Sequence, residues 1–538
     1  MKKHYLNYLL NLITPAFLFG ALTGIFTAIV VNLYKVAASF VIGISEKGYH
    51  YLGEHLYWIP AVLLVLLGMA FLYAWVYKRV PNLRGGGIPT SIGILRGLMP
   101  FKWLLNLAGV FLLSLGTFLV GVPLGNEGPS VQMGTAIGRG SVYSFAKKHR
   151  AWDRYAMTGG ACAAFGVATG APISGILFAI EEAHERISPM IFLVSATAVI
   201  FGYITTELMA PLLGISTELF PPMQLTTLSL KEIWIPIAVG LAMGLLASLF
   251  LTYYRLIRGF FTKTFRKVPH SICIFGVFAL TLGMGLLSGG FISTGHELII
   301  DLFDGKVAVY MLLLILLVRA TLTLFANANG ITGGLFVPIL ALGAILSSAL
   351  GKVAVSLFDI SHDKYVMILV LGITACIASL MKTPLTAILF AVEALSCYAN
   401  ILHVILAVTI AFVITEVFDV KNINETVLDA RMEEINEGKR LVTVDTLVTV
   451  QKGSFAVGKQ IRDIFWPANL FVLSIRQGEN NKTSGGGQGG KALHEKDVLH
   501  VHYSTYNEEE TRGELLAIVG EQDLAEEGTA IKNGEQEL

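Results

Sequence analysis

One carboxylate of this sequence stands where a charge is least expected. Glu127 lies in "PLGNEGPSVQMG" (123–134), directly after 24 residues that contain no Asp, Glu, Lys or Arg. A charge at the end of such an apolar segment is costly unless something stabilises it. Gly125 and Gly128 permit close approach of the backbone, and Pro129 suits the first turn of a helix. The free N–H groups of that helix end attract either the Glu127 carboxylate or an anion, and the two should compete.

Two further segments share this form. "RGGGIP" (84–89) and "GGLFVP" (333–338) also place glycines before a proline within apolar sequence. Three Gly-rich helix starts of this kind predict a small-anion site built from main-chain amides. Binding by amides rather than by fixed cations is weak enough to let an ion leave as well as enter.

The composition indicates what holds this site. The chain has 538 residues, 54% of them hydrophobic and 14% charged, whereas soluble domains carry about 25% charged residues. Residues 430–538 hold 12 Lys/Arg and 18 Asp/Glu, so the net charge of +7 belongs to the rest of the chain. This excess suits loops held in the cytoplasm by the positive-inside rule. We therefore predict a long part in the lipid bilayer and a soluble C-terminal domain, with no basic patch for nucleic acid.

The membrane part contains interrupted helices and an internal repeat. Glycines and Pro172 break the apolar stretch 155–180, and "NANGITGGLFVP" interrupts the stretch 320–351. "APISGILFAIEEA" (171–183) matches "TPLTAILFAVEAL" (383–395) at an offset of 212 residues. Duplicated halves with broken helices at matching positions indicate a midplane binding site in a transporter.

In their order and spacing, "GGGIP", "GNEGP" and "GGLFVP" resemble the signature loops of the CLC family of chloride channels and proton-coupled chloride transporters. The resemblance covers roughly residues 15–430. It implies an all-α polytopic membrane domain over 1–430, with inverted repeats at about 15–215 and 230–425. It also implies a homodimer with one anion pathway in each subunit.

The resemblance assigns roles to individual residues. Glu127 matches the gating glutamate, which occupies an anion position when ionised and swings away when protonated. Glu182 matches the internal glutamate that passes protons in exchanging members. The positions implied to line the anion pathway are Gly86, Gly87, Ile88, Asn126, Gly128, Leu335, Phe336, Val337 and Asn424.

Three of these residues depart from the family pattern. Gly86 stands in place of a serine, Asn424 in place of a tyrosine, and Asn126 in place of a basic residue. The central anion site therefore lacks two of its usual side-chain donors, although an asparagine amide can still donate. We expect weaker or less selective anion binding and looser coupling. The fluoride-exporting branch also departs at the serine position, but Glu182 and "GGLFVP" favour chloride.

The tail has a different pattern. Residues 441–450 and 497–505 read as strands, 456–478 as a short helix, a turn at Pro467 and a strand, and 507–520 as a helix. After a linker at 431–440, residues 441–522 resemble the regulatory TrkA-C (RCK-C) domain, and 523–538 are expected to be disordered.

Domains of the TrkA-C type pair, and the resemblance implies cyclic di-AMP as a regulator in the groove between partners. The residues that would lie there are Ile461, Asp463, Asn469 and Leu470. Phe465 departs from an arginine often found in that groove. A dimerising domain without a ligand is the alternative.

We expect exchange of chloride for protons, with no cofactor and no bound metal, in a multi-pass bacterial cell-membrane protein whose C-terminal domain is cytoplasmic. The competing hypotheses are a passive chloride channel, a fluoride/proton antiporter and a membrane-embedded enzyme that uses Glu127 and Glu182 as a pair. No metal-ligand spacing or Ser/His arrangement supports the enzyme. The alternative interpretation of Glu181 and Glu182 is a pair of solvated carboxylates where a helix reaches the cytoplasm. Glu393 is expected to bind helix ends.

Overall fold

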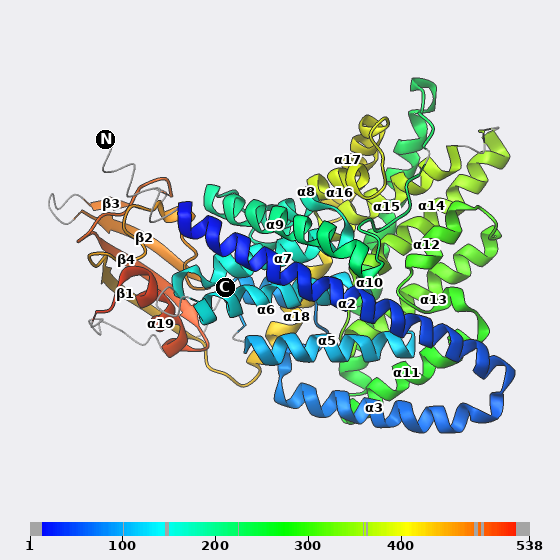
Figure 1. Cartoon of the computed structure of the whole chain (residues 1–538), viewed down its shortest axis with the longest axis horizontal. Coiled ribbons are helices and arrows are strands. Elements are labelled where there is room, and N and C mark those ends of the chain that lie inside the picture. The colour runs from blue at the N-terminus through cyan, green and yellow to red at the C-terminus, as the bar shows by residue number, and fades with distance from the viewer. Residues whose placement is uncertain are drawn as a thin grey trace, which may run out of the picture.

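The chain folds into a helical bundle followed by a small sheet domain (Figure 1). The computed structural model describes residues 13–99, 102–145, 150–223, 225–358, 360–361, 364–477, 483–485 and 489–522. The predicted fold class, an all-α membrane domain with a small C-terminal α/β domain, is confirmed. Helix α18 (Ile423–Asn436) ends the bundle and extends into the predicted 431–440 linker. The expected disorder of 523–538 lies outside the described residues.

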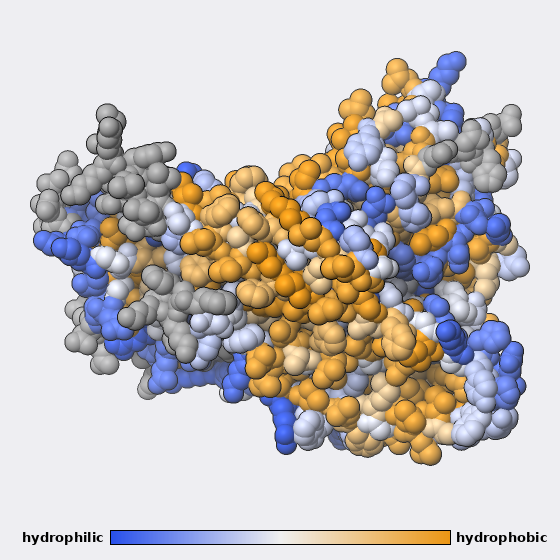
Figure 2. All heavy atoms as spheres, viewed as in Figure 1, coloured by the Kyte–Doolittle hydropathy of each residue, from blue (hydrophilic) through white to orange (hydrophobic). Residues whose placement is uncertain are grey.

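Among the described residues, eight helices are long and apolar enough to cross a bilayer, judged by length and composition. They are α2 (Thr14–Glu54), α3 (Ile59–Arg79), α5 (Trp103–Val120), α9 (Pro189–Leu213), α10 (Trp234–Thr264), α11 (His270–Leu287), α13 (Val309–Ala328) and α14 (Phe336–Phe358). Figure 2 shows apolar side chains over the middle of this face of the bundle and hydrophilic ones toward both ends. The band suits contact with lipid, in which helices satisfy their own backbone groups.

The remaining helices of the bundle are shorter or less apolar than these candidate spans, as the Gly and Pro breaks predict. They are α4 (Ile88–Leu95), α6 (Glu127–Phe145), α7 (Asp153–Thr169), α8 (Pro172–Phe178), α12 (His296–Phe303), α15 (Tyr365–Met381), α16 (Pro384–Glu393), α17 (Ile401–Val417) and α18. Every residue of α7 after Asp153 is buried, and α15 is buried almost throughout. These two helices therefore form the centre of the bundle.

Matching glycines show that the two halves pack alike. A Cβ on Gly134 of α6 would lie 2.2 Å from the carbonyl oxygen of Gly160 of α7. In the second half, a Cβ on Gly343 of α14 would lie 2.8 Å from the carbonyl oxygen of Gly372 of α15. Small residues allow such close helix crossings in membranes. The predicted duplication is therefore present in the packing.

A reciprocal exchange of carboxylates joins the halves. Glu393 of α16 accepts hydrogen bonds from the backbone N–H groups of Ile173 (2.7 Å) and Ser174 (2.8 Å) in the first turn of α8. Glu181 accepts from those of Leu385 (2.9 Å) and Thr386 (2.7 Å) in α16. The prediction that Glu393 binds a helix end is confirmed. Glu181 has the same role, so its reading as a solvated carboxylate is wrong.

The C-terminal domain is an antiparallel sheet with one covering helix. The strands β1 (Val442–Thr449), β2 (Leu470–Arg476), β3 (Thr483–Gly485) and β4 (Val498–Thr505) take the order β1-β4-β2-β3. Helix α19 (Glu508–Val519) follows β4 and packs its buried Leu515, Ile518 and Val519 into the core of this domain. The strands expected at 441–450 and 497–505 and the helix expected at 507–520 are confirmed.

The short helix expected after residue 456 is reduced to a 3-10 turn, Ile461–Asp463. The backbone N–H groups of Ile461 and Arg462 donate instead to the carbonyls of Lys491 (3.2 Å) and Gly489 (3.0 Å). Pairing with a segment about thirty residues away therefore overrides the local helical pattern.

Lys459 should make the sheet domain more stable at alkaline pH. Its side chain is 8% exposed, and burial lowers the pKa of its ammonium group from 10.5 to about 8. Between these values the unfolded chain binds more protons than the folded chain, so stability should rise with pH over that window. Lys459→Met should remove this dependence and stabilise the domain near neutral pH by about 3 kcal/mol. Pulse proteolysis in urea at both ends of the window measures this, and an equal rise with pH in the variant would contradict it.

Candidate anion site

The three Gly-rich segments meet at their glycines. Gly125 and Gly334 exchange two backbone hydrogen bonds of 2.8 Å each, in an isolated antiparallel bridge. A Cβ on Gly128 would lie 2.6 Å from the Cα of Gly334 and 3.2 Å from the Cα of Gly87. Gly87 has φ +108°, which a side chain would strain. Only glycine fits this contact, so the segments bring the starts of α4, α6 and α14 together.

Except for Asn424, which belongs to α18, the residues predicted to line the anion pathway lie at or next to these helix starts. Ile88 is the first residue of α4, and Leu335, Phe336 and Val337 surround the start of α14. All four side chains are buried. The Phe336 ring packs against Phe165 and Phe390, with centroid distances of 5.1 and 5.5 Å. The apolar side chains thus pack into the bundle, while the main chain supplies the polar groups of the site.

Glu127 is the first residue of α6 and is 1% exposed. The backbone N–H groups of Asn126 and Glu127 favour the charged form of its carboxylate. In the amide orientation that satisfies both groups, Asn126 Nδ2 also donates to Glu127 Oε1 (2.7 Å) and Oε2 (3.2 Å). The carboxylate therefore occupies the helix N-terminus like a tethered anion.

Gln132 is a residue of this site that the motifs do not reveal. Its Oε1 accepts a hydrogen bond of 2.5 Å from the backbone N–H of Gly87, an amide expected to face the anion. A Cβ on Gly86 would lie 2.7 Å from the same oxygen. Gln132 therefore occupies the space beside Gly86 and engages the Gly87 amide that was predicted to bind the anion.

Removing the Gln132 side chain should strengthen anion binding. Gln132→Ala frees the Gly87 N–H, and one hydrogen bond is worth about 1 kcal/mol, so chloride affinity should rise about fivefold. Gly86→Ser should be tolerated better together with Gln132→Ala than alone, because the serine Cβ would clash with Gln132. Calorimetric titration of the solubilised protein with chloride measures the affinity. Thr135→Ala is the control, since Thr135 lies on the same helix and bonds to the carbonyl of Val131; an equal gain there would refute the competition.

Glu182 lies in a π-helical turn, Ala179–Ala183, that follows α8, and it is 3% exposed. Its Oε1 accepts a hydrogen bond from Asn424 Nδ2 of α18. The reading of Glu182 as a solvated carboxylate is therefore wrong. The Asn424 donor that we expected to face the anion binds this glutamate instead. Asn424, which was predicted to bind the anion, thus contacts Glu182, which was predicted to transfer protons.

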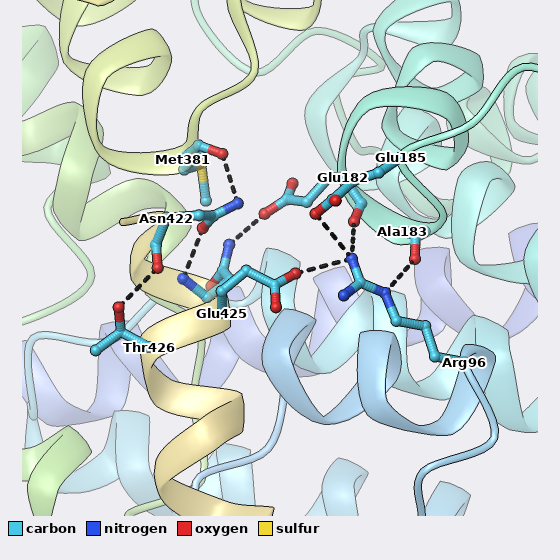
Figure 3. Close-up of polar contacts among 9 residues, drawn as sticks. Arg96, Glu182, Ala183, Glu185, Met381, Asn422, Glu425 and Thr426 are labelled. Carbon is cyan, nitrogen blue, oxygen red and sulfur yellow. Dashed lines mark hydrogen bonds and ion pairs between the residues drawn. The ribbon is translucent and has the colours of Figure 1, made fainter. Parts of the chain in front are cut away.

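Arg96 organises the surroundings of Glu182 (Figure 3). Its guanidinium donates to the carbonyl oxygens of Glu182 (3.0 Å) and Ala183 (2.9 Å). It also forms ion pairs with Glu185 (3.1 Å) and Glu425 (2.8 Å). Arg96 therefore ties the end of α4 to the π-helical turn and to the first turn of α18, and it holds the backbone of the predicted proton-transfer residue.

Lys35 of α2 is a second residue of this site that the motifs did not include. Its charge acts on the Glu127 carboxylate. Its Nζ donates to the carbonyl oxygens of Ser216 (3.3 Å) and Val167 (3.5 Å). A lysine in an apolar helix is a signal in the sequence, because such charges are costly in a membrane. Its partner could not be read from the sequence.

The sheet domain contacts the bundle close to Glu182. Phe465 packs on Tyr155 and His184, with centroid distances of 4.4 and 4.5 Å. Ser188 Oγ donates to Asp463 Oδ1 at 3.0 Å, and Arg154 pairs with Glu514 at 2.5 Å. Phe465 thus replaces the expected arginine with an apolar contact to the bundle.

The four residues predicted for a nucleotide groove lie together near this contact. Ile461 and Asp463 belong to the 3-10 turn, and Asn469 and Leu470 lead into β2. The main-chain oxygen of Asp463 also accepts a hydrogen bond from Tyr155. Asp463 is therefore engaged with the bundle, while the other three belong to the sheet domain itself.

Broken helices that start at a shared cluster of glycines, beside a buried carboxylate and within apolar spans, define a membrane protein for anion transport. The model of the family described as "Voltage gated chloride channel" matches residues 69–416, and the chain belongs to this family.

Among the described residues, no group of three or more His, Cys, Asp or Glu side chains could hold a metal ion.

Named relatives and solved structures agree with this family. The H(+)/Cl(-) exchange transporter ClcA of Salmonella typhimurium is 28% identical over 429 residues, which cover 78% of this chain and 90% of the relative. The structure of a slow cyanobacterial Cl-/H+ antiporter matches with a TM-score of 0.69 at 24% identity, over 78% of this chain and 99% of the other. A CLC-type fluoride/proton antiporter matches with a TM-score of 0.61 at 19% identity, over 76% and 97%.

Proposed function

We propose that this protein exchanges chloride for protons across a membrane. The observation that carries the proposal is the pair of buried carboxylates, Glu127 at the start of α6 and Glu182 beside α18. When ionised, Glu127 takes the amides that would hold an anion. When protonated, it loses its attraction for the helix end and gives way to chloride. Glu182 then passes the proton toward the cytoplasm.

The relatives support chloride as the substrate, since the Salmonella protein is named a H(+)/Cl(-) exchange transporter. Flux from reconstituted vesicles tests the proposal. An outward chloride gradient should drive protons into the vesicle against their own gradient. Chloride flux without uphill proton movement would identify a passive channel. A strong preference for fluoride would identify a fluoride/proton antiporter.

We also propose that the C-terminal domain, of TrkA-C type, regulates transport through its contact with the bundle. Phe465 packs on His184, two residues after Glu182, so a shift of the domain would move the end of the π-helical turn that holds the predicted proton-transfer residue. Thermal unfolding of the full chain with and without cyclic di-AMP tests the ligand. An unchanged melting temperature would support the alternative, a domain that dimerises without binding this nucleotide.

We place the protein in a bacterial cell membrane as a homodimer, with the C-terminal domain in the cytoplasm. α8, α9, α16 and α17 keep large apolar side chains exposed, including Ile173, Leu212, Leu385 and Leu402. A second copy or lipid would cover such a face. Cross-linking in native membranes tests the pairing, and exclusively monomeric bands would refute it.

A further inference from the structure

A cavity of about 680 Å³ opens beside the ends of α3, α10, α11 and α18, next to the segment that leads into the sheet domain. Phe261 and Phe265 form part of its wall. Its volume falls within the range of small-molecule sites, about 300–1,000 Å³. It is therefore larger than a halide ion requires, and it lies outside the glycine cluster described above.

The charge that lines this cavity is mainly positive. The described Lys and Arg residues in its wall are Lys78, Arg84, Arg258, Arg431 and Lys439, and the carboxylate among them is that of Glu434. Glu434 pairs with Arg84 at 2.8 Å. Arg258 pairs with Glu433 at 3.1 Å, whereas Lys78 and Lys439 form no ion pair within the part of the chain that the structure describes. The positive side chains of the wall therefore outnumber the carboxylates that pair with them.

Arg431 is the residue that most needs a partner. Its side chain is 9% exposed, and its Nε has no hydrogen-bond partner among the described residues. An unpaired buried cation costs several kcal/mol. A guanidinium presents its donors in a planar fork that matches carboxylate and phosphate oxygens. The geometry thus leaves an acceptor missing beside Arg431.

We propose that this cavity binds a phosphate-bearing ligand, with Arg431 at its base and Lys78, Arg258 and Lys439 around the group. A phosphate offers several acceptor oxygens to such donors. The aromatic wall suits the carbon part of the ligand. The same chemistry occurs in the headgroup of an anionic lipid and in a soluble phosphate ester.

The position of Arg431 explains how a bound ligand would influence the anion site, because Arg431 lies against the first Gly-rich segment. A Cβ on Gly85, in the first Gly-rich segment, would lie 1.5 Å from Arg431 Nη2. The Gly85 N–H donates to the carbonyl of Gly330 at 2.5 Å, shortly before the third segment. A phosphate on Arg431 would neutralise a positive charge directly behind these two segments.

The test uses the full chain in a neutral detergent and two probes, inorganic pyrophosphate and dioctanoyl phosphatidylglycerol. Dioctanoyl phosphatidylcholine is the zwitterionic control. Calorimetric titration gives the affinity, and intrinsic fluorescence on heating gives the melting temperature. These are binding measurements, so they succeed or fail independently of chloride–proton exchange.

Two matched double variants locate the site. Lys78→Gln with Arg258→Gln removes two cations of the wall, whereas Arg79→Gln with Arg255→Gln removes two from the same helices outside it. The first variant should bind at least about tenfold more weakly, since each charged hydrogen bond is worth more than a neutral one. The second should bind within about twofold of the original chain.

Binding of pyrophosphate alone would identify a soluble ligand, binding of phosphatidylglycerol alone would identify a lipid headgroup, and binding of both would show that the phosphate suffices. Each of these supports the proposal if it depends on Lys78 and Arg258. Binding of neither probe above the phosphatidylcholine control would overturn it. An equal loss of affinity in both double variants would also overturn the proposal. Such a result would show that the probes respond to the overall positive charge around the ends of α3 and α10 and not to this cavity.

Discussion

Replacing Glu127 by glutamine should abolish uphill proton movement and leave chloride flux in place. The amide has nearly the size of the carboxyl group but cannot release or take up a proton near neutral pH. It also lacks the charge that holds the side chain at the start of α6. Proton flux driven by a chloride gradient should fall by at least about 100-fold, and chloride flux should no longer respond to pH. Paired pH and chloride electrodes on a vesicle suspension measure both.

Glu393→Gln is the matched control for this experiment. Glu393 also holds backbone amides at a helix start, through Ile173 and Ser174 of α8. Its loss should destabilise the protein by about 1–3 kcal/mol and leave the ratio of protons to chloride unchanged. If Glu127→Gln merely lowered the melting temperature and kept the coupling, Glu127 would be a helix cap like Glu393, and the proposed exchange mechanism would fail.

The main features of the site could be predicted because they depend on local sequence. Glycine and proline determine where α4, α6 and α14 begin, and the repeat fixes which of these starts correspond. A carboxylate inside an apolar stretch is visible without a structure. Each of these signals can be recognised from the residue types alone, without knowledge of which distant segments come into contact.

The partners of these residues could not be predicted, because they come from distant segments. Gln132 looks like an ordinary polar residue of α6 until Gly87, 45 residues earlier, donates to it. Asn424 was expected to face the anion, but its partner Glu182 is 242 residues away. The helix expected after residue 456 failed for the same reason, since residues 489–491 take its backbone groups.

Glu182→Gln should uncouple chloride flux from proton flux by blocking proton transfer on the inner side of the protein. Glu182 is buried on Asn424, so a glutamine can keep the hydrogen bond but cannot carry a proton. Proton flux should again fall by about 100-fold. Chloride flux should persist and should still respond to external pH, because Glu127 remains free to titrate. This remaining response separates the variant from Glu127→Gln, in which it is lost.

Glu181→Gln tests whether burial and position, rather than a negative charge at this turn, determine proton transfer. The two glutamates are adjacent in sequence, but Glu181 binds the start of α16 through Leu385 and Thr386. Its loss should lower the melting temperature and spare the coupling. If Glu181→Gln uncoupled transport as strongly as Glu182→Gln, the proton route would depend on the packing of α8 against α16, and Glu182 would be a positioning residue. If only Glu182→Gln uncouples transport, the inner half of the proton route passes through the carboxylate that α18 holds through Asn424.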